Sequence, residues 1–137
     1  MLIILGFGFF TTRSYSQKCV QCTDSICIYG AIAFALEDYP KSLQYCNDAI
    51  KLNPNDFNAR LTRGQVKARL GDYRGAILDF DKAIDICPEK WGGYYYRGVT
   101  KIALGEIDST NSACLDLSKA GELGKMEAYD LIKKACH

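Results

Sequence analysis

Histidine is nearly absent from this chain of 137 residues, because the only one is the C-terminal His137. An acid–base or nucleophilic site built around an imidazole, such as a Ser–His–Asp arrangement, is therefore excluded. The sequence also lacks a glycine-rich phosphate loop and the ligand spacing of a metal cluster. These absences predict a binding protein rather than an enzyme, with no cofactor and no metal ion.

An excess of charge of one sign is also lacking. Seventeen Lys and Arg residues face sixteen Asp and Glu residues, and no block of like charge occurs. Electrostatic attraction to nucleic acid or to anionic lipid is therefore not indicated. The length suits one domain with a continuous core.

No apolar run approaches the roughly 20 residues that a membrane-spanning helix needs. The N-terminal run, Leu2–Phe10, has nine residues, and the small residues Ser14 and Ser16 follow it. This order is typical of a signal peptide, although no Lys or Arg precedes the run. We expect residues 1–17 to be a signal peptide, the mature chain to begin near Gln17, and the protein to be periplasmic or secreted. A hydrophobic cap helix of a cytoplasmic protein is the alternative.

The rest of the chain repeats with a period of 34 residues. The spacing of apolar residues in the middle copy, Phe57–Lys90, predicts two helices, Asn58–Leu70 and Tyr73–Ile86. Pro88 ends the second helix, because proline has no amide hydrogen to donate and clashes with the preceding turn. A fixed period of this length predicts stacked helical hairpins. The matching positions are Gly30, Gly64 and Gly98, then Pro54 and Pro88, Tyr39 and Tyr73, and Ala49 and Ala83.

The order of residues in the middle copy resembles the tetratricopeptide repeat: Gly64, Tyr73, Ala76, Phe80, Ala83 and Pro88. The resemblance implies an all-α fold, an α-solenoid of stacked antiparallel helical hairpins. It also implies a non-enzymatic scaffold that binds a protein or peptide in its concave groove. We expect a short cysteine-containing segment at residues 18–22 and a capping helix at residues 126–137. Between them we expect three repeats, at residues 23–56, 57–90 and 91–125. The third repeat departs from the pattern, because its second helix is longer and has no proline.

In such a stack the first helix of each hairpin lines the concave side. We expect the groove to bind an extended or helical peptide with apolar and aromatic side chains. The sequence does not identify this partner, and it does not show the oligomeric state. Members of the family that clamp a terminal carboxylate use Lys, Asn and Arg, and the matching places here hold Cys27, Ala31, Thr62, Gly92 and Tyr96. That role is therefore not expected. The predicted groove residues are Phe34, Asn58, Leu61, Gln65, Arg69, Tyr95, Val99 and Ile102.

Two pairs of basic residues recur one period apart. Arg63 corresponds to Arg97, and Lys67 to Lys101. They could form a ligand-binding column, but we favour structural pairing with carboxylates. The candidate partners are Asp79, Asp85 and Asp116.

The chain has seven cysteines, so at least one thiol stays unpaired within a monomer. Cys19 and Cys22 form a C-x-x-C pair, and an exported thiol-redox or metal-handling protein is the alternative function. A zinc site needs four ligands and no second pair follows, so structural disulfides or free thiols are favoured. Cys27, Cys46 and Cys87 could equally be small buried fillers. We expect Cys114 and Cys136 to be disulfide-bonded, because the capping helix packs antiparallel beside the last repeat's second helix.

Overall fold

The computed structural model describes residues 25–105 and 112–136, which form helices and turns and contain no strand. Our predictions for the signal peptide and for the C-x-x-C pair fall outside these ranges. None of the helices in the described ranges combines the length and the hydrophobicity needed to cross a bilayer. The helices are α2 (Ser25–Ala35), α3 (Tyr39–Leu52), α4 (Phe57–Arg69), α5 (Tyr73–Ile86), α6 (Trp91–Leu104), α7 (Ser112–Glu122) and α8 (Glu127–Ala135).

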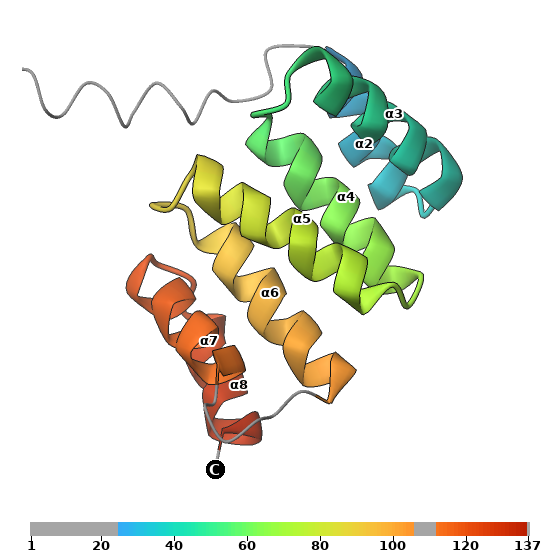
Figure 1. Ribbon diagram of the computed structural model, residues 1–137. Helices are drawn as coiled ribbons and strands as arrows, with labels where there is room; N and C mark the ends of the chain where they lie inside the picture. Colours follow the sequence, from blue (N-terminus) through green and yellow to red (C-terminus); the bar gives the residue numbers. More distant parts are fainter. Residues whose placement is uncertain (1–24, 106–111, 137) are drawn as a thin grey trace, which may run out of the picture.

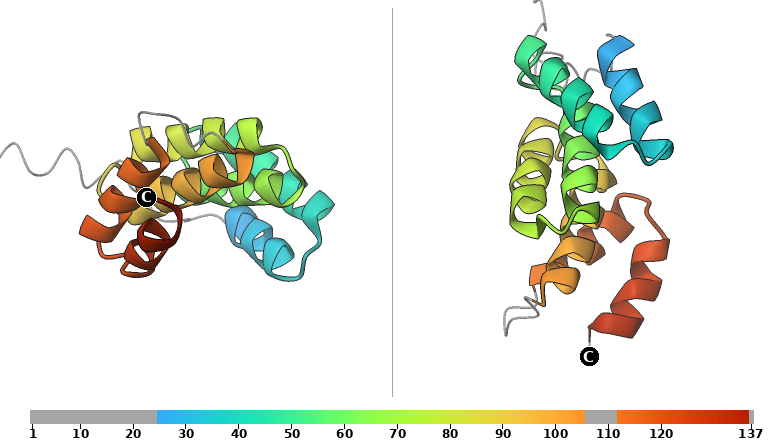
Figure 2. Two further views of the ribbon diagram at one scale, coloured as in Figure 1. Left: turned by 90° about the horizontal axis from the view of Figure 1, so that it is seen from below. Right: turned by 90° about the vertical axis from the view of Figure 1, so that its right-hand side faces the viewer.

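Consecutive helices pack as hairpins, and the hairpins stack into a curved row. The pairs are α2 with α3, α4 with α5, and α6 with α7, and α8 packs on α7 (Figure 1). Neighbouring hairpins join through the α3–α4 and α5–α6 contacts. In both views of Figure 2, α2 and α8 lie on the same side of the layer formed by α4, α5 and α6. The predicted all-α solenoid of helical hairpins is therefore confirmed.

The turns between helices are held by aspartates that precede three of the helices. The side chain of Asp56 accepts a hydrogen bond from the Ala59 amide at 2.9 Å, and that of Asp72 accepts one from the Gly75 amide at 2.9 Å. Asp38 does the same for α3. Each such cap satisfies an amide that the helix leaves without a partner, and is worth about 1 kcal/mol. The boundaries predicted for the second helix of the middle unit, Tyr73–Ile86, are confirmed.

The recurring glycines allow the two helices of each hairpin to approach closely. A Cβ atom on Gly64 would lie 2.6 Å from Cε1 of Phe80, whose ring is fully buried. A Cβ atom on Gly98 would lie 2.9 Å from the carbonyl oxygen of Ala113 on α7. Distances this short require the neighbour to move, and a buried ring or a helix backbone moves only at a cost. The sequence places glycine inside these helices because the partner helix occupies the space of a side chain.

Replacing Gly64 with alanine tests this explanation. Alanine favours a helix over glycine by about 1 kcal/mol, yet we expect Gly64→Ala to lower the free energy of unfolding by about 1–2 kcal/mol, because the Phe80 ring must shift. Gly92→Ala is the matched control, since its nearest neighbour is the half-buried end of Leu61 at 3.0 Å, which can turn away. Urea unfolding followed by circular dichroism measures both. Equal or greater stability of Gly64→Ala would show that the close approach does not require glycine.

Candidate functional site

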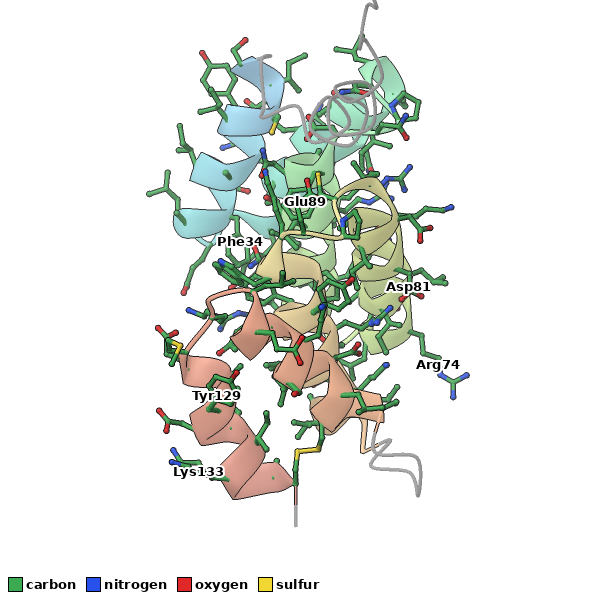
Figure 3. The ribbon with its side chains drawn as sticks, turned by 90° about the vertical axis from the view of Figure 1, so that its left-hand side faces the viewer. Phe34, Arg74, Asp81, Glu89, Tyr129 and Lys133 are labelled. Atoms are coloured by element: carbon green, nitrogen blue, oxygen red, sulfur yellow. A yellow bond between two sulfur atoms is a disulfide. The ribbon has the colours of Figure 1, made fainter. Side chains whose placement is uncertain are left out.

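A cavity of about 490 Å³ opens on the concave side of the stack. Phe34 of α2 and Leu131 of α8 lie on two of its walls, and α4, α5 and α6 supply the others. Figure 3 shows Phe34 at the C-terminal end of α2, in the space between that helix and the α7–α8 pair. The lining residues are mainly aromatic and apolar: Phe34, Gln65, Ala68, Arg69, Tyr73, Phe80, Tyr95, Tyr96, Val99, Thr100, Ala103 and Leu131.

The structure brings together five of the eight residues that the sequence assigned to the groove. The three others, Asn58, Leu61 and Ile102, do not line the cavity. Leu61 packs against the buried cluster around Phe57, because α6 starts with glycines and comes close to it. Ile102 packs instead on the cluster around Leu117. The five that line it are Phe34, Gln65, Arg69, Tyr95 and Val99.

Sequence reasoning missed the contributions of the second helices and of α8. The fully buried Phe80 ring lies against Gly64, where α4 has no side chain, and borders the cavity. Leu131 joins the wall because α8 folds back toward the concave side, where it packs near Tyr95 and Val99. The signal in the sequence that could have indicated this position of Phe80 is Gly64, one of the glycines that recur every 34 residues.

Aromatic rings on α6 form a connected wall of the cavity. The Tyr95 and Tyr96 rings meet edge to face at 5.3 Å, and Phe80 stacks on Tyr96 at 5.9 Å. Trp91 meets Tyr95 edge to face at 6.0 Å, and the Lys125 ammonium lies 4.9 Å from the Trp91 ring centre. Such ring pairs and cation–π contacts fix side chains in place. The wall is therefore a preformed apolar surface with few rotamers left to freeze on binding.

The recurring basic residues are paired with buried carboxylates. Arg63 donates from Nε and Nη2 to Asp79 at 2.9 and 2.6 Å, and Lys67 Nζ lies 2.8 Å from the same carboxylate. One period later Arg97 and Lys101 make the corresponding contacts with Asp116. The preference for structural pairing is thus confirmed at Asp79 and Asp116. The third candidate, Asp85, pairs instead with Lys82 on its own helix.

The environment of Asp79 makes its pairing sensitive to acid. Burial by itself raises the pKa of Asp79, but the hydrogen bonds and positive charges of Arg63 and Lys67 outweigh burial and hold the pKa below its ordinary value. A carboxylate whose pKa is lowered on folding stabilises the fold above its unfolded pKa of about 3.9. That contribution is lost as the pH falls below this value, through the folded pKa.

We predict that Asp79→Asn lowers the free energy of unfolding by about 3 kcal/mol at pH 7, because two half-buried cations lose their buried partner. The difference from the parent protein should shrink as the pH falls below about 4, and should be lost once the pH is below the lowered folded pKa of Asp79. Asp85→Asn is the control, because Asp85 is exposed and pairs only within its helix. Thermal unfolding between pH 2.5 and 7 measures both. A difference that stays constant down to pH 2.5 would contradict the assignment.

The cysteines in the described ranges carry no reactive site. Cys114 and Cys136 are joined in a disulfide with Cα atoms 6.1 Å apart, and Cys27 and Cys87 are buried and disulfide-bonded as well. Cys46 is a free thiol, and burial raises its pKa to about 11, so the reactive thiolate is scarce at neutral pH. Within the same ranges, no three His, Cys, Asp or Glu side chains gather in a way that could hold a metal ion.

Known proteins share this arrangement. The sequence profile of the tetratricopeptide repeat matches residues 30–105. Hsp70-Hsp90 organizing protein 3 of Arabidopsis thaliana is 31% identical over 75 residues, which are 55% of this chain and 13% of that protein. The chain thus spans only a small part of the length of this relative.

Solved structures agree with the fold. The TPR2B domain of yeast Sti1, solved as a complex with pHsp70, is 26% identical with a TM-score of 0.74 over 81% of this chain and 93% of that one. The first TPR domain of Spaghetti (RPAP3), bound to the HSP90 peptide SRMEEVD, is 19% identical with a TM-score of 0.75 over 81% and 87%. At that identity the second likeness shows the fold alone.

The glycine-spaced hairpins, the concave cavity and the profile match agree with one another. The matched residues 30–105 make up more than half of the chain. The chain belongs to the tetratricopeptide repeat family.

Proposed function

We propose that this chain is a non-enzymatic scaffold that binds a protein or peptide segment in its concave groove. The observation that carries the proposal is the cavity of about 490 Å³ lined by aromatic rings on that side. A preformed concave apolar surface with a few polar groups is the usual form of a ligand site. The TPR2B domain of yeast Sti1, which resembles this chain, was solved as a complex with pHsp70.

The lining residues indicate the chemistry of the ligand. Most of the wall is aromatic or aliphatic, so it suits the apolar side chains of an extended or helical segment. Arg69 is the charged residue among the lining side chains, and with Gln65 it offers hydrogen-bond donors at one side. The ligand therefore carries an apolar or aromatic anchor and an acidic or carbonyl acceptor next to it.

A clamp for a terminal carboxylate is not part of this proposal. Two of the places that would hold its basic residues, Cys27 and Thr62, are buried, and a third is Gly92. Arg63 and Lys67, which lie nearby on α4, are already paired with Asp79. We therefore expect an internal segment of the partner rather than its C-terminal carboxylate.

The same proposal assigns the parts of the chain. Three repeats occupy residues 23–56, 57–90 and 91–125, and each contains one of the hairpins described above. Residues 126–137 form the capping segment, in which α8 exposes Glu127, Asp130, Lys133 and Lys134. A terminal repeat needs such a polar outer surface to stay soluble.

Selection from a random-peptide display library tests the groove against peptides of many different sequences. We expect selected peptides to share apolar or aromatic residues and to bind with a micromolar dissociation constant, which corresponds to a binding free energy of roughly −8 kcal/mol. Tyr95→Ala and Arg69→Glu should each weaken binding about tenfold without loss of helicity. Isothermal titration measures affinity, and the fluorescence of Trp91, the only tryptophan, reports on the Tyr95 wall.

Two exposed positions away from the groove serve as matched controls. Leu115→Ala removes a side chain of α7 that is 67% exposed, and Arg74→Glu makes the same charge change as Arg69→Glu on the exposed side of α5. Both should bind selected peptides as the parent protein does. Unchanged affinity in Tyr95→Ala and Arg69→Glu, or equal losses in the controls, would place the binding surface elsewhere.

We also propose that the protein works in an oxidising compartment after export. The N-terminal apolar run supports export, and the disulfide-bonded cysteines support an oxidising environment. The Cys114–Cys136 bond closes a loop with a sequence separation of 22, for which chain entropy gives roughly 3 kcal/mol of stabilisation. It also ties α8, and with it Leu131, to the last hairpin.

Mass spectrometry of the protein isolated from its own cells tests this second proposal. We expect the intact mass to show loss of residues up to about Ser16, and non-reducing peptide mapping to recover a Cys114–Cys136 crosslink. Cys46 should be alkylated only after unfolding, because it is buried. A full-length species, or Cys114 and Cys136 both freely alkylated in the native protein, would contradict it.

A further inference from the structure

Helix α2 presents an uncovered apolar face at the N-terminal end of the stack. Ile28, Tyr29 and Ile32 are each about half exposed, at 49%, 51% and 49%, and Leu36 is 75% exposed. These positions recur on one side of the helix, away from the buried Cys27, Gly30 and Ala33. We call Ile28, Tyr29, Ile32 and Leu36 the α2 end face. Tyr45 of α3 extends it, because its ring lies 5.8 Å from that of Tyr29.

The opposite end of the stack is covered differently. Figure 1 shows α2 and α8 at opposite ends of the row of hairpins. Helix α8 exposes two acidic and two basic side chains, whereas α2 contains no charged residue at all. Single exposed apolar residues are ordinary, but three large ones on one helix face, followed by Leu36 in the next turn, mark an interaction surface.

The residues just before α2 are too few and too polar to cover this face in the exported form proposed above. That form begins near Gln17 and leaves eight residues before Ser25, of which Val20 is the only large aliphatic one. Four large apolar side chains need a comparable apolar surface against them. By composition, residues 17–24 supply little of that surface, and a second molecule would supply it.

We infer that the α2 end face binds the same face of a second copy, so that two chains form a closed head-to-head dimer. In a two-fold interface each residue meets its own kind or a near neighbour, so the uncharged side chains of α2 bring no like charges together. Head-to-tail stacking would instead bury Glu127, Asp130, Lys133 and Lys134 of α8 against an apolar surface, at a high desolvation cost. The asymmetry between the two ends thus gives a dimer and not a filament.

The dimer leaves both grooves open. The cavity is lined from the other side of α2 by Phe34, and the end face residues do not line it. Two grooves held in one particle would bind a partner with repeated segments more tightly than one groove alone.

Sedimentation velocity of the protein as its cells produce it, from about 1 to 200 µM, tests the inference. A face of one short helix lies at the small end of stable interfaces, so we expect a monomer–dimer equilibrium with a dissociation constant on the order of 10 µM. Ile32→Glu should raise it at least tenfold while helicity and melting temperature stay near those of the parent protein. Leu115→Glu is the matched control, because Leu115 is singly exposed at 67% on α7, and it should dimerise normally.

A crosslink provides a positive test that does not depend on loss of binding. Ile32→Cys should give a disulfide-linked dimer under mild oxidation by oxidised glutathione, whereas Leu115→Cys should not. The inference is overturned by a monomer at all concentrations, or by a dimer that Ile32→Glu leaves intact. It is also overturned if removal of the residues before Ser25 converts a monomer into a dimer, because the chain would then cover its own end face.

Discussion

The close approach of paired helices is the constraint on which the rest of this structure depends. A Cβ atom on Gly30, Gly64 or Gly98 would lie 3.0, 2.6 or 2.9 Å from an atom of the partner helix. Because these glycines recur every 34 residues, each hairpin closes at the same point, and the hairpins stack with a regular offset. The glycine that permits the contact also seats the fully buried Phe80 ring against α4, next to the concave cavity.

The same geometry decides which charges are available for binding. Closing the hairpin brings Asp79 of α5 beside Arg63 and Lys67 of α4, and the next hairpin repeats this arrangement around Asp116. A buried carboxylate needs such partners, since burial without them would cost several kcal/mol. The basic residues of the first helices are thereby used within the fold. The groove keeps its aromatic wall and Arg69, and so suits an apolar segment better than a terminal carboxylate.

The sequence was sufficient for the fold and for part of the cavity. The 34-residue period and the positions of glycine and proline indicate where the helices end and turn, so the hairpins and the helix Tyr73–Ile86 could be predicted. Helical spacing placed Gln65, Arg69, Tyr95 and Val99 on the concave side, where they line the cavity. Spacing alone could not show that α6 would cover Leu61, because that contact depends on how two hairpins cross. It could not show Leu131 either, because the direction of α8 is set by the turn after α7 and not by the repeat.

Burial also separates cysteines that look alike in the sequence. Cys46 lies inside the first hairpin against Gly30 and stays a free thiol, whereas Cys114 and Cys136 meet where α8 returns along α7. The 22 residues between Cys114 and Cys136 do not by themselves show that these two cysteines are bonded and that Cys46 is free, because a separation of that length can join many pairs of helices. The distinction comes from which helices are neighbours, and so from the same stacking that forms the groove.

Chemical-shift mapping of the ¹⁵N-labelled protein with a display-selected peptide tests the central claim most directly. If the concave cavity is the binding site, the largest changes will fall on amides of α4 and α6 around Gln65, Arg69, Tyr95 and Val99, with smaller ones near Phe34 and Leu131. The amides on the exposed side of α5, around Arg74 and Leu78, will stay unchanged. Changes concentrated on the exposed side of α5, or confined to the α2 end face, would contradict the claim.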